Sequence, residues 1–299
     1  MNFPDPKILV TGANGFIGRH VVQELATQTP PLLQIIHSGQ AHTALPSITM
    51  ELLDITDLPD LPTTIETIYH LAGQIWGDET HEAKMLDNVI ALAKQCNAKR
   101  IVYASTCAVY GQNAMDQTVD ESVDGAPASP YARGKLLGEQ SLKTLSDTSE
   151  MNVTILRYFN PYGPHQFAKM AVPNMIEKAI TGQDIEIYGD GEQIRDFIYI
   201  EDLAKATIAA AEGEGKYQIF NIGSGQGETI KDLASEIIAQ SQSSSKIIHL
   251  PIPAERQNLE VYYRVADIGK ITRLTNWEPE TSLSKGLKRL VSEHRACVE

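Results

Sequence analysis

Cysteine is scarce in this chain, which has three in 299 residues: Cys96, Cys107 and Cys297. They form no Cys-x-x-Cys pair, so the sequence predicts neither a disulfide framework nor a metal site. Long apolar runs are also missing, as is a basic-then-apolar leader. Since a bilayer span needs about 18 apolar residues, we expect a cytoplasmic protein with no membrane partner.

The chain also has fewer basic than acidic residues. The chain has 25 Lys and Arg against 38 Asp and Glu, a formal net charge of −13. Nucleic acids and anionic membranes bind basic surfaces, so neither is an expected partner. An anionic small molecule still fits an acidic chain wherever a few arginines converge.

Short apolar strands alternate with helical patterns through the first 160 residues. This alternation predicts an α/β fold with a doubly wound parallel sheet that helices cover on both faces. The expected strands are 7–10, 32–36, 49–53, 67–71, 100–104 and 152–158. The expected helices are 16–26, 84–96 and 131–145.

Three glycines follow the first predicted strand with the spacing Gly12-x-x-Gly15-x-x-Gly18. Glycine permits a tight turn and lets backbone N–H groups approach a pyrophosphate at a helix N-terminus. The spacing alone suits a purely structural turn equally well, but its place between strand and helix favours a bound dinucleotide in a Rossmann-like fold. The candidate cofactor-binding residues here are Gly12, Asn14, Gly15, Phe16, Ile17 and Gly18.

The regular alternation of strands and helices ends after Pro161, where turn residues become frequent. We expect a dinucleotide-binding domain at 1–165 and a smaller mixed α/β substrate domain at 166–299. The run that begins at Phe220 resembles a strand end, so the chain is expected to return to the main sheet around 200–225. The cleft between the two parts is the expected ligand site. The helices expected in the second part are 172–181, 200–211 and 230–240.

The second strand ends without the carboxylate that usually holds the adenosine ribose of NAD. His37 and Ser38 stand there instead. A carboxylate would repel a 2′-phosphate, so its absence leans weakly toward NADP and leaves NAD or NADP open. His37 either is an uncharged residue that only fills space at the strand end, or it contacts the phosphate of the cofactor. Asp54, with Ile55 beside it, follows the third strand and is either an adenine contact or a helix N-cap.

Tyr131 and Lys135 lie four residues apart in a predicted helix and so share one face. An ammonium stabilises a phenolate, so we expect the pKa of Tyr131 to fall from about 10 toward neutrality. Such a phenol can take a proton from an alcohol or give one to a ketone. Taken alone, the spacing is more often a surface pair. Ser105 and Thr106 end the fifth predicted strand, and one of them could share the hydrogen bond of the reacting oxygen.

With these motifs together, the chain resembles an extended short-chain dehydrogenase/reductase, in the group of NAD-dependent epimerases and dehydratases of nucleotide sugars. The likeness extends over nearly the whole chain, and many motifs occur in the same order. The matching runs are 11–18, 70–73, 105–111, 130–135, 156–164, 189–191, 195–202, 220–225, 266–267 and 277–279.

The resemblance implies roles for the residues that match the family's motifs. Thr106 takes the catalytic Ser/Thr position and Tyr131 is the acid/base. Lys135 holds the nicotinamide ribose and lowers the pKa of the tyrosine. Leu71 and Ala72 are expected at the cofactor.

The resemblance also places residues around a nucleotide-diphosphate sugar. Asn160 is expected near the sugar, and Arg195 and Arg256 at the diphosphate, since two guanidiniums can bind it bidentately. For Arg195 the alternative is an ion pair with Asp196 or Asp202.

The chain departs from the family's pattern beyond the missing second-strand acid. The stretch from Ala72 to Asn88 is shorter than in relatives, and Glu82 stands where an Asn often precedes this helix. Dehydratases that resemble this site carry Asp-Glu after the catalytic Ser/Thr, and decarboxylases a Glu at the second place. Here Cys107 and Ala108 stand there. Ala108 cannot move a proton, so both reactions are disfavoured.

Three functions remain as hypotheses. The first is an epimerase-type oxidoreductase that transfers hydride at the sugar C4 with a nicotinamide cofactor. The second is an NADPH-dependent reductase of a 4-keto-deoxy-sugar nucleotide. The third, from another class, is a catalytically idle nucleotide-binding module, against which the Thr/Tyr/Lys cluster argues. Relatives often dimerise through the helices at 84–96 and 131–145, so we expect a homodimer.

Overall fold

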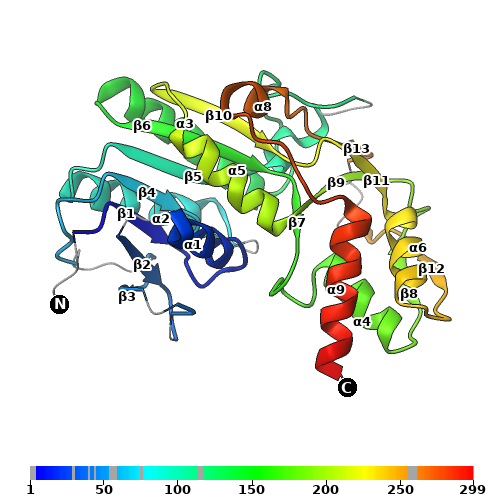
Figure 1. The fold of residues 1–299 in the computed structure, drawn as a ribbon. Helices are drawn as coiled ribbons and strands as arrows, with labels where there is room; N and C mark the ends of the chain where they lie inside the picture. Colours follow the sequence, from blue (N-terminus) through cyan, green and yellow to red (C-terminus); the bar gives the residue numbers. More distant parts are fainter. Residues whose placement is uncertain are drawn as a thin grey trace.

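Seven parallel strands form the main sheet of the protein, in the order β10-β6-β5-β4-β1-β2-β3 (Figure 1). The computed structural model describes residues 5–28, 31–39, 41–43, 45–53, 59–74, 77–113, 117–254 and 261–298. The strands of this sheet are β1 (Ile8–Thr11), β2 (Leu32–Ile36), β3 (Ser47–Thr49), β4 (Thr67–His70), β5 (Arg100–Thr106), β6 (Asn152–Tyr158) and β10 (Tyr217–Ile222).

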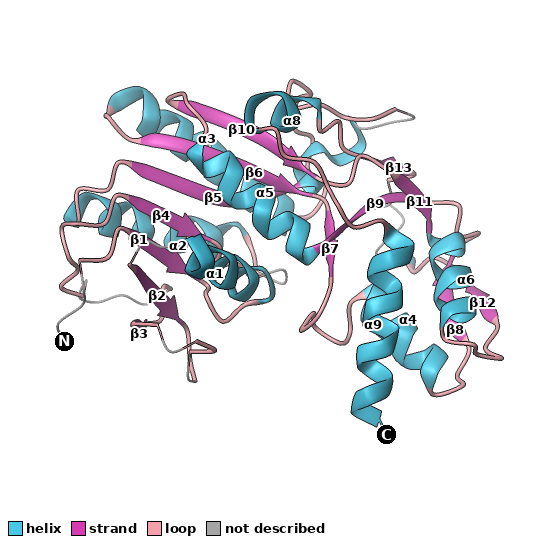
Figure 2. Cartoon of the chain, viewed as in Figure 1, coloured by secondary structure: helices cyan, strands magenta, loops and turns pink. Residues whose placement is uncertain are grey.

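Helices cover both faces of this sheet (Figure 2). On one face, α1 (Phe16–Gln28) and α5 (Ile200–Glu212) bury their apolar sides against the strands. On the other, α2 (Glu79–Gln95) and α3 (Pro130–Thr148) do the same. Because both faces are buried, the strands consist of continuous apolar runs, as in β2, all five residues of which are buried. The predicted α/β, Rossmann-like class is confirmed.

The strand order reverses between β1 and β4, which are neighbours in the sheet. From β1 the chain moves outward to β2 and β3, and from β4 it moves the other way to β5, β6 and β10. Loops leaving β1 and β4 therefore diverge to opposite faces and open a crevice at their carboxyl ends. Gly12 follows β1 and Leu71 follows β4, so the glycine loop lies at this crevice.

A smaller part of the molecule lies beyond the carboxyl edge of the main sheet (Figure 1). Helices α4 (Ala171–Ile180), α6 (Ile230–Gln240) and α9 (Leu283–Val298) pack with the parallel pair β8 (Ile185–Tyr188) and β12 (Ile247–Leu250) around a core of their own. A four-stranded mixed sheet connects the two parts. It consists of β7 (Asn160–Tyr162), β9 (Ile194–Tyr199), β11 (Gly227–Thr229) and β13 (Tyr263–Arg264).

The chain passes between the two parts more than once. After β9 it forms α5 on the main sheet, and β10 pairs with β6 at the sheet edge, where the run at Phe220 was expected to return. The short helix α8 (Gly269–Thr275) also packs against the main-sheet core through Ile271. The division at residue 165 stays a prediction.

The third strand was predicted in the wrong place. It was expected at 49–53, but β3 ends at Thr49. Its partner β2 ends at Ile36, whose carbonyl accepts the last ladder bond, from Met50 N at 2.8 Å. Beyond that point no strand remains beside it, so the apolar residues that follow bury their side chains without pairing.

Helix α2 begins earlier than the predicted 84–96. Asp78 caps it by accepting from His81 N at 3.0 Å, and Glu79 and Glu82 lie in its first turn. Carboxylates near a helix N-terminus are favoured by the helix dipole. The other predicted strands and helices agree with the structure to within a few residues.

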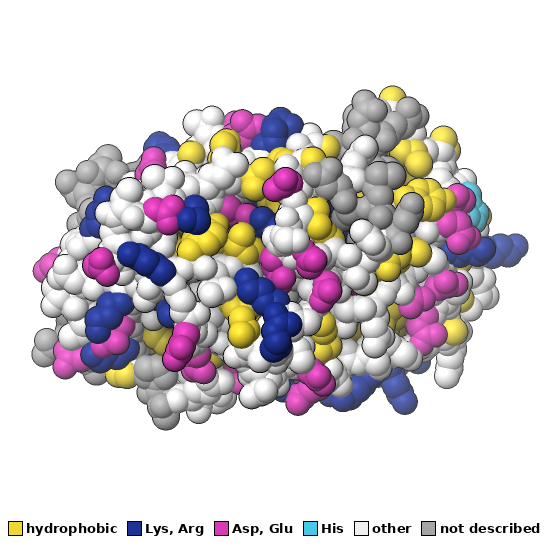
Figure 3. Space-filling model, turned by 90° about the horizontal axis from the view of Figure 1, so that it is seen from above, with side chains coloured by type: hydrophobic (Ala, Val, Ile, Leu, Met, Phe, Trp, Pro, Cys, Tyr) yellow, Lys and Arg dark blue, Asp and Glu magenta, His cyan; other side chains and the backbone are white. Residues whose placement is uncertain are grey.

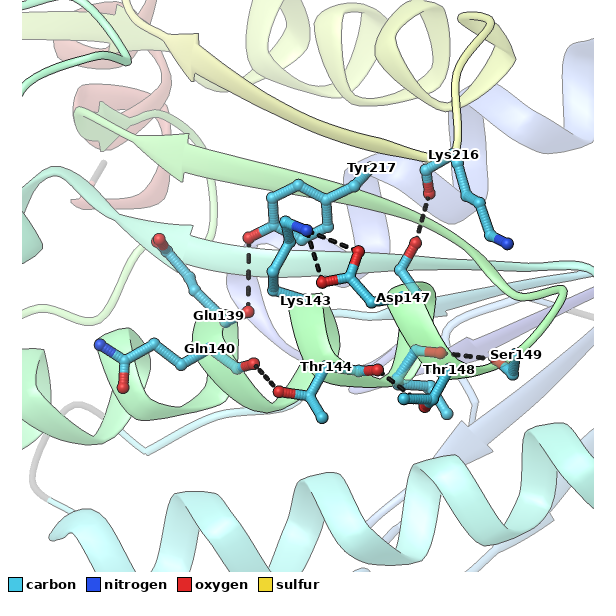
Figure 4. Close-up of polar contacts among 11 residues, drawn as sticks. Glu139, Gln140, Lys143, Thr144, Asp147, Thr148, Ser149, Lys216 and Tyr217 are labelled. Atoms are coloured by element: carbon cyan, nitrogen blue, oxygen red, sulfur yellow. Dashed lines mark hydrogen bonds and ion pairs between the residues drawn. The ribbon is translucent and has the colours of Figure 1, made fainter.

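The helix that carries Tyr131 and Lys135 is fixed along its length. Ser129 caps α3 at its start by accepting from Ala132 N at 3.2 Å. Further along, the Tyr217 hydroxyl donates to the Glu139 carbonyl, and Ser146 donates to the Lys216 carbonyl (Figure 4). Both contacts tie α3 to the start of β10, so the helix has a fixed position on the sheet.

Candidate active site

A cavity of about 410 Å³ opens at the carboxyl edge of the main sheet, between the two parts of the molecule. The ends of β4, β5 and β6, the start of α1 and the segment before α4 line it. The predicted site residues that line it are Gly15, Phe16, Ile17, Gly18, Leu71, Ala72, Thr106, Tyr131, Lys135 and Asn160. Three other predicted residues, Asp54, Ile55 and Arg256, lie outside the described residues.

The glycine loop has room for backbone alone. A Cβ on Gly12 would lie 2.6 Å from the nitrogen of Ala72, and the residue has a φ of +70°. A Cβ on Gly18 would lie 2.0 Å from the Gly12 carbonyl oxygen. A side chain at Gly12 would displace the loop after β4, and one at Gly18 would push α1 away from the glycine turn. Because the first N–H groups of an α-helix have no partner within the helix, the start of α1 suits an anionic ligand such as a dinucleotide pyrophosphate.

A carboxylate that the sequence did not reveal lies beside the end of β2. His37 contacts Glu51, which follows β3, through its Nε2 and the Glu51 Oε2. Ser38 lies beside them, and its carbonyl accepts from the Asn14 amide at 3.4 Å. The second strand therefore lacks its own acid but has the Glu51 carboxylate, from the segment after β3, beside its end.

Tyr131 is partly buried in the structure and faces Thr106. Burial raises the pKa of its phenol above the ordinary value of 10, the charges at Glu82 and Cys107 add to this, and a hydrogen bond with Thr106 acts the other way. The expectation that Lys135 would lower this pKa toward neutrality is therefore wrong. The main reason is the burial of the phenol, to which a carboxylate close by adds.

That carboxylate belongs to Glu82 in the first turn of α2. Its Oε1 lies 2.8 Å from Lys135 Nζ and also accepts from the Tyr103 hydroxyl at 2.7 Å. The side chains of Lys135 and Glu82 are 3% and 5% exposed. Burial alone would raise the pKa of the Glu82 carboxyl, but Lys135, His70 and the two hydrogen bonds outweigh it and lower this pKa.

The two hydroxyls that end β5 have different surroundings. Ser105 and Thr106 both line the cavity, but the Ser105 hydroxyl donates to the buried Glu139 carboxylate at 2.5 Å. The Thr106 hydroxyl accepts from Ala108 N at 3.2 Å and lies beside Tyr131. The methyl side chain of Ala108 offers no acid or base beside it.

Two arginines lie side by side close to Cys107, which lines the cavity, although neither arginine is among its lining residues. Arg195 on β9 pairs in register with Arg264 on β13, and both act on the buried thiol of Cys107, whose pKa burial raises and the two arginines lower. The carboxylate of Asp196, which the sequence offered as an alternative partner of Arg195, accepts three backbone N–H groups and the Ser224 hydroxyl. Arg264, which the sequence analysis did not name, thus lies beside Arg195, whereas the expected Arg256 lies outside the described residues.

Asn160 reaches toward the same strands. Its amide nitrogen donates to the Asp196 carbonyl at 2.7 Å while the residue lines the cavity. On the opposite wall, Phe167, Met170 and Val172 supply apolar surface from the segment before and into α4. No sequence signal marked these residues, because irregular segments reach a cavity without a periodic pattern. Phe167 is 57% exposed.

The surface carries both signs of charge. Lys and Arg side chains are interspersed with Asp and Glu over the face seen in Figure 3. In the part of the chain that the structure describes, no helix has the length and apolar character that crossing a bilayer requires.

Comparisons with known proteins agree with this geometry. The profile of the "NAD dependent epimerase/dehydratase family" matches residues 8–223. The UDP-N-acetyl-alpha-D-glucosaminuronate decarboxylase of Bacillus cytotoxicus is 31% identical, over 97% of this chain and 98% of the relative. The UDP-glucuronate 4-epimerase of Thermodesulfobacterium geofontis is 30% identical, over 97% of each.

A solved structure shows the same arrangement of the whole chain. It is a variant of UDP-glucuronic acid 4-epimerase from Bacillus cereus in complex with NAD and UDP-4-deoxy-4-fluoro-glucuronic acid. The TM-score is 0.86 at 29% identity, over 97% of this chain and 99% of that one. The lean toward NADP finds no support in these comparisons. Because the family profile covers most of the chain and relatives match it from end to end, the chain belongs to the NAD dependent epimerase/dehydratase family of nucleotide-sugar-modifying enzymes.

Proposed function

We propose that this protein is an epimerase-type oxidoreductase that transfers hydride at C4 of a nucleoside-diphosphate sugar, using NAD. One observation carries the proposal: Thr106, Tyr131 and Lys135 line the same cavity as the start of α1. A hydroxyl, a phenol and an ammonium thus meet beside a loop built for a dinucleotide pyrophosphate.

Each of the three side chains has a defined task in this proposal. Tyr131 exchanges a proton with the oxygen on C4, and Thr106 shares the hydrogen bond to that oxygen. Lys135 donates to the ribose next to the nicotinamide. The dinucleotide supplies the acceptor and donor of hydride when bound. The apolar lining from Ile17 to Phe167 excludes water from the reacting carbon.

The residues after Thr106 limit the chemistry to oxidation and reduction. Both Cys107 and Ala108 lack a carboxylate, and burial raises the pKa of the Cys107 thiol. Elimination of water or loss of a carboxyl group from the sugar would need a group that moves a second proton. The likeness to a decarboxylase therefore does not decide the reaction, because relatives with different reactions share the fold and the remaining motifs.

The diphosphate of the substrate is assigned to the paired arginines. Arg195 and Arg264 lie on adjacent strands at the register pair that ends β13. Two guanidiniums at neighbouring positions suit a diphosphate, whose oxygens accept several hydrogen bonds at once. Arg256, outside the described residues, stays a candidate from the sequence.

NAD is the proposed cofactor because of Glu51. Its carboxylate contacts His37 at the end of β2, where the adenosine ribose of a bound dinucleotide would lie. A carboxylate there accepts from a 2′-hydroxyl and repels a 2′-phosphate. Glu51→Gln should therefore narrow the preference for NAD over NADP, while Glu66→Gln, on the far side of β1, should not change it.

A net reductase of a 4-keto sugar nucleotide is the second candidate. The observation that favours it is the raised pKa of Tyr131, because a neutral phenol is ready to give a proton to a ketone. The same Thr106, Tyr131 and Lys135 would serve this reaction, since reduction is one half of epimerisation.

Identification of the nucleotide that accompanies the purified protein tests the proposal. The nucleotide is released by denaturation and identified by mass, and the protein is then assayed with UDP- and dTDP-linked hexoses and their 4-keto forms. Tightly held NAD and interconversion of C4 epimers support the epimerase. Loose NADPH consumed by a keto sugar supports the reductase. Failure to bind either cofactor would overturn both.

We also propose that the protein forms a homodimer through α2 and α3. These helices lie next to each other on one face of the sheet, and Leu137 on α3 is 47% exposed there. Sedimentation of the purified protein as a monomer at micromolar concentration would contradict this.

A further inference from the structure

The two sides of the active-site cavity differ in their chemistry. One side consists of the glycine loop and the carboxyl ends of the strands, which suit the dinucleotide. The opposite wall is formed by Phe167, Met170 and Val172, from the segment that leads into α4, and by Phe197 on β9. These four side chains are apolar, so a sugar that reaches Tyr131 lies against an apolar surface.

The lining of the cavity has little charge. Among the described residues that form it, Lys135 alone is charged, and its Nζ lies 2.8 Å from the Glu82 carboxylate. The pair is therefore neutral as a whole, and in the proposed function this ammonium also holds the ribose of the dinucleotide. A carboxylate brought in by the sugar would find no second cation in this part of the lining.

Polar side chains of the lining make hydrogen bonds within the protein. The amide nitrogens of Asn160 and Gln166 donate to backbone carbonyls at 2.7 and 2.8 Å. The Ser105 hydroxyl donates to the Glu139 carboxylate at 2.5 Å. A bound carboxylate would have to compete with these acceptors, while the Thr106 hydroxyl is assigned to the oxygen on C4.

Basic residues near the cavity have other positions. Arg195 and Arg264 lie close to Cys107 and are assigned to the diphosphate, which every nucleoside-diphosphate sugar carries. Lys169 belongs to the segment before α4, but it is exposed and is not among the lining residues. The guanidiniums would therefore meet the charges of the diphosphate, and a further negative charge on the sugar would be left without a partner of its own.

The place of C6 follows from the place of C4. In the proposed function Thr106 and Tyr131 hold the oxygen on C4, and C6 is only two bonds away from C4. The group on C6 therefore lies in the same cavity, close to the reacting carbon. Cys107, which is buried and also lines the cavity, offers it a thiol instead of a cation.

We propose that the sugar of the substrate carries an uncharged group at C6, a hydroxymethyl or a methyl, and that the cavity rejects hexuronates. This inference rests on the proposed function, which places C4 at Tyr131. A carboxylate against Phe167 and Met170 would lose its hydration without gaining a cation, which is strongly unfavourable. A methyl or hydroxymethyl group buries carbon against the same wall without that loss.

Binding of sugar nucleotides that differ only at C6 measures this preference. Tyr131→Phe, loaded with dinucleotide to keep the site intact while slowing turnover, is titrated calorimetrically with UDP-glucose and UDP-glucuronate, and with UDP-galactose and UDP-galacturonate. The uncharged member of each pair should bind at least about 10²-fold more tightly. UDP-xylose, which lacks C6, should bind closer to UDP-glucose than to UDP-glucuronate, because the discrimination depends on charge.

A cation added to the apolar wall should reverse part of the preference. Phe167 lines the cavity and is 57% exposed, so an arginine there can lay its stem on the wall and direct its guanidinium to the ligand. Phe167→Arg should raise the affinity for UDP-glucuronate relative to UDP-glucose by about tenfold or more.

Two variants serve as matched controls. Leu274→Arg adds the same charge on α8, at a side chain that is 53% exposed and outside the lining, so the ratio of the two affinities should not change. Phe167→Gln removes the ring without adding a charge, so the preference for UDP-glucose should remain.

The outcomes separate this inference from the proposed function. Equal or tighter binding of the uronates overturns the inference even if the wild type interconverts C4 epimers. Preference for the uncharged sugars supports it, and absence of hydride transfer in the wild type would then count against the proposed function alone. Binding of none of these sugar nucleotides overturns both. An unchanged ratio in Phe167→Arg contradicts the placement of C6 at this wall, and should that variant fail to fold, the ratios without it decide.

Discussion

Glu139 on α3 holds Arg157 on β6 through two hydrogen bonds, with Nη2 to Oε2 at 2.7 Å and Nε to Oε1 at 3.1 Å. Both side chains are at most 5% exposed, and Arg157 also stacks on the Tyr110 ring. Ser105 donates to the same carboxylate. The contact fixes the helix of Tyr131 against the sheet and occupies the serine hydroxyl, which leaves Thr106 for the active site.

Glu139→Gln should destabilise the protein strongly. The change leaves the Arg157 guanidinium buried without a counter-charge, and breaking such a pair costs about 3–5 kcal/mol. Urea unfolding at pH 7 measures the loss. Asp147→Asn is the matched control on the same helix, because its pair with Lys143 is half exposed and is expected to contribute only about 0.3–0.5 kcal/mol (Figure 4). Equal losses of unfolding free energy in the two variants would show that the buried pair stabilises the fold no more than the exposed one.

Tyr131→Phe should retain the ring packing and lose the proton. Turnover is expected to fall by about 10²–10⁴-fold, the usual contribution of a general acid or base. The affinity for the dinucleotide, measured by calorimetry, should change little. Near-normal turnover in this variant would remove Tyr131 from its assigned role.

Gly12→Ala should abolish dinucleotide binding. The new Cβ would meet the backbone of Ala72, which cannot move without shifting β4. Gly182→Ala provides the control, since Gly182 has the same φ of +70° with nothing within 4 Å of its Cβ. It should cost only the left-handed backbone strain, about 1–2 kcal/mol, and leave binding intact. Binding by Gly12→Ala at wild-type affinity would mean that the loop does not hold the cofactor.

His70 should make the protein sensitive to mild acid. Burial lowers its pKa from 6.5 to about 4, so in this range the unfolded chain binds the proton more readily than the folded one. The contribution of His70 to stability is complete above pH 6.5 and is lost as the pH falls to 4, a change of about 3 kcal/mol. His70→Asn should show a smaller loss of unfolding free energy between pH 7 and 4. Identical pH profiles for both proteins would contradict this.

The sequence allowed the chemistry of the site to be predicted better than its electrostatics. Local motifs identify Gly12, Gly18, Tyr131 and Lys135, because each depends on spacing within one turn or one helix. The pKa of Tyr131 depends instead on its burial in the folded chain and, after that, on Glu82, which lies far from it in sequence and approaches when α2 and α3 pack together. The expected fall of this pKa was wrong for that reason.

Pairing between strands that are distant in the sequence was the other feature that the sequence did not predict. β3 lies before the predicted 49–53 because its length is set by where β2 ends. Arg264 was missed because the two-residue strand that places it beside Arg195 has no pattern of its own. Likewise, Glu51 contacts His37 from the segment after β3, a place that the motif does not include.

Transfer of hydride from C4 is the central claim, and isotopic labelling tests it most directly. The protein loaded with dinucleotide is incubated with nucleoside-diphosphate hexoses that carry deuterium at C4, and both sugar and cofactor are analysed by mass. The proposed function predicts that deuterium appears on the reduced dinucleotide and, in an epimerase cycle, returns to C4 of the epimer, and that Tyr131→Phe suppresses the transfer. Sugars that bind but never pass deuterium to the dinucleotide would contradict it.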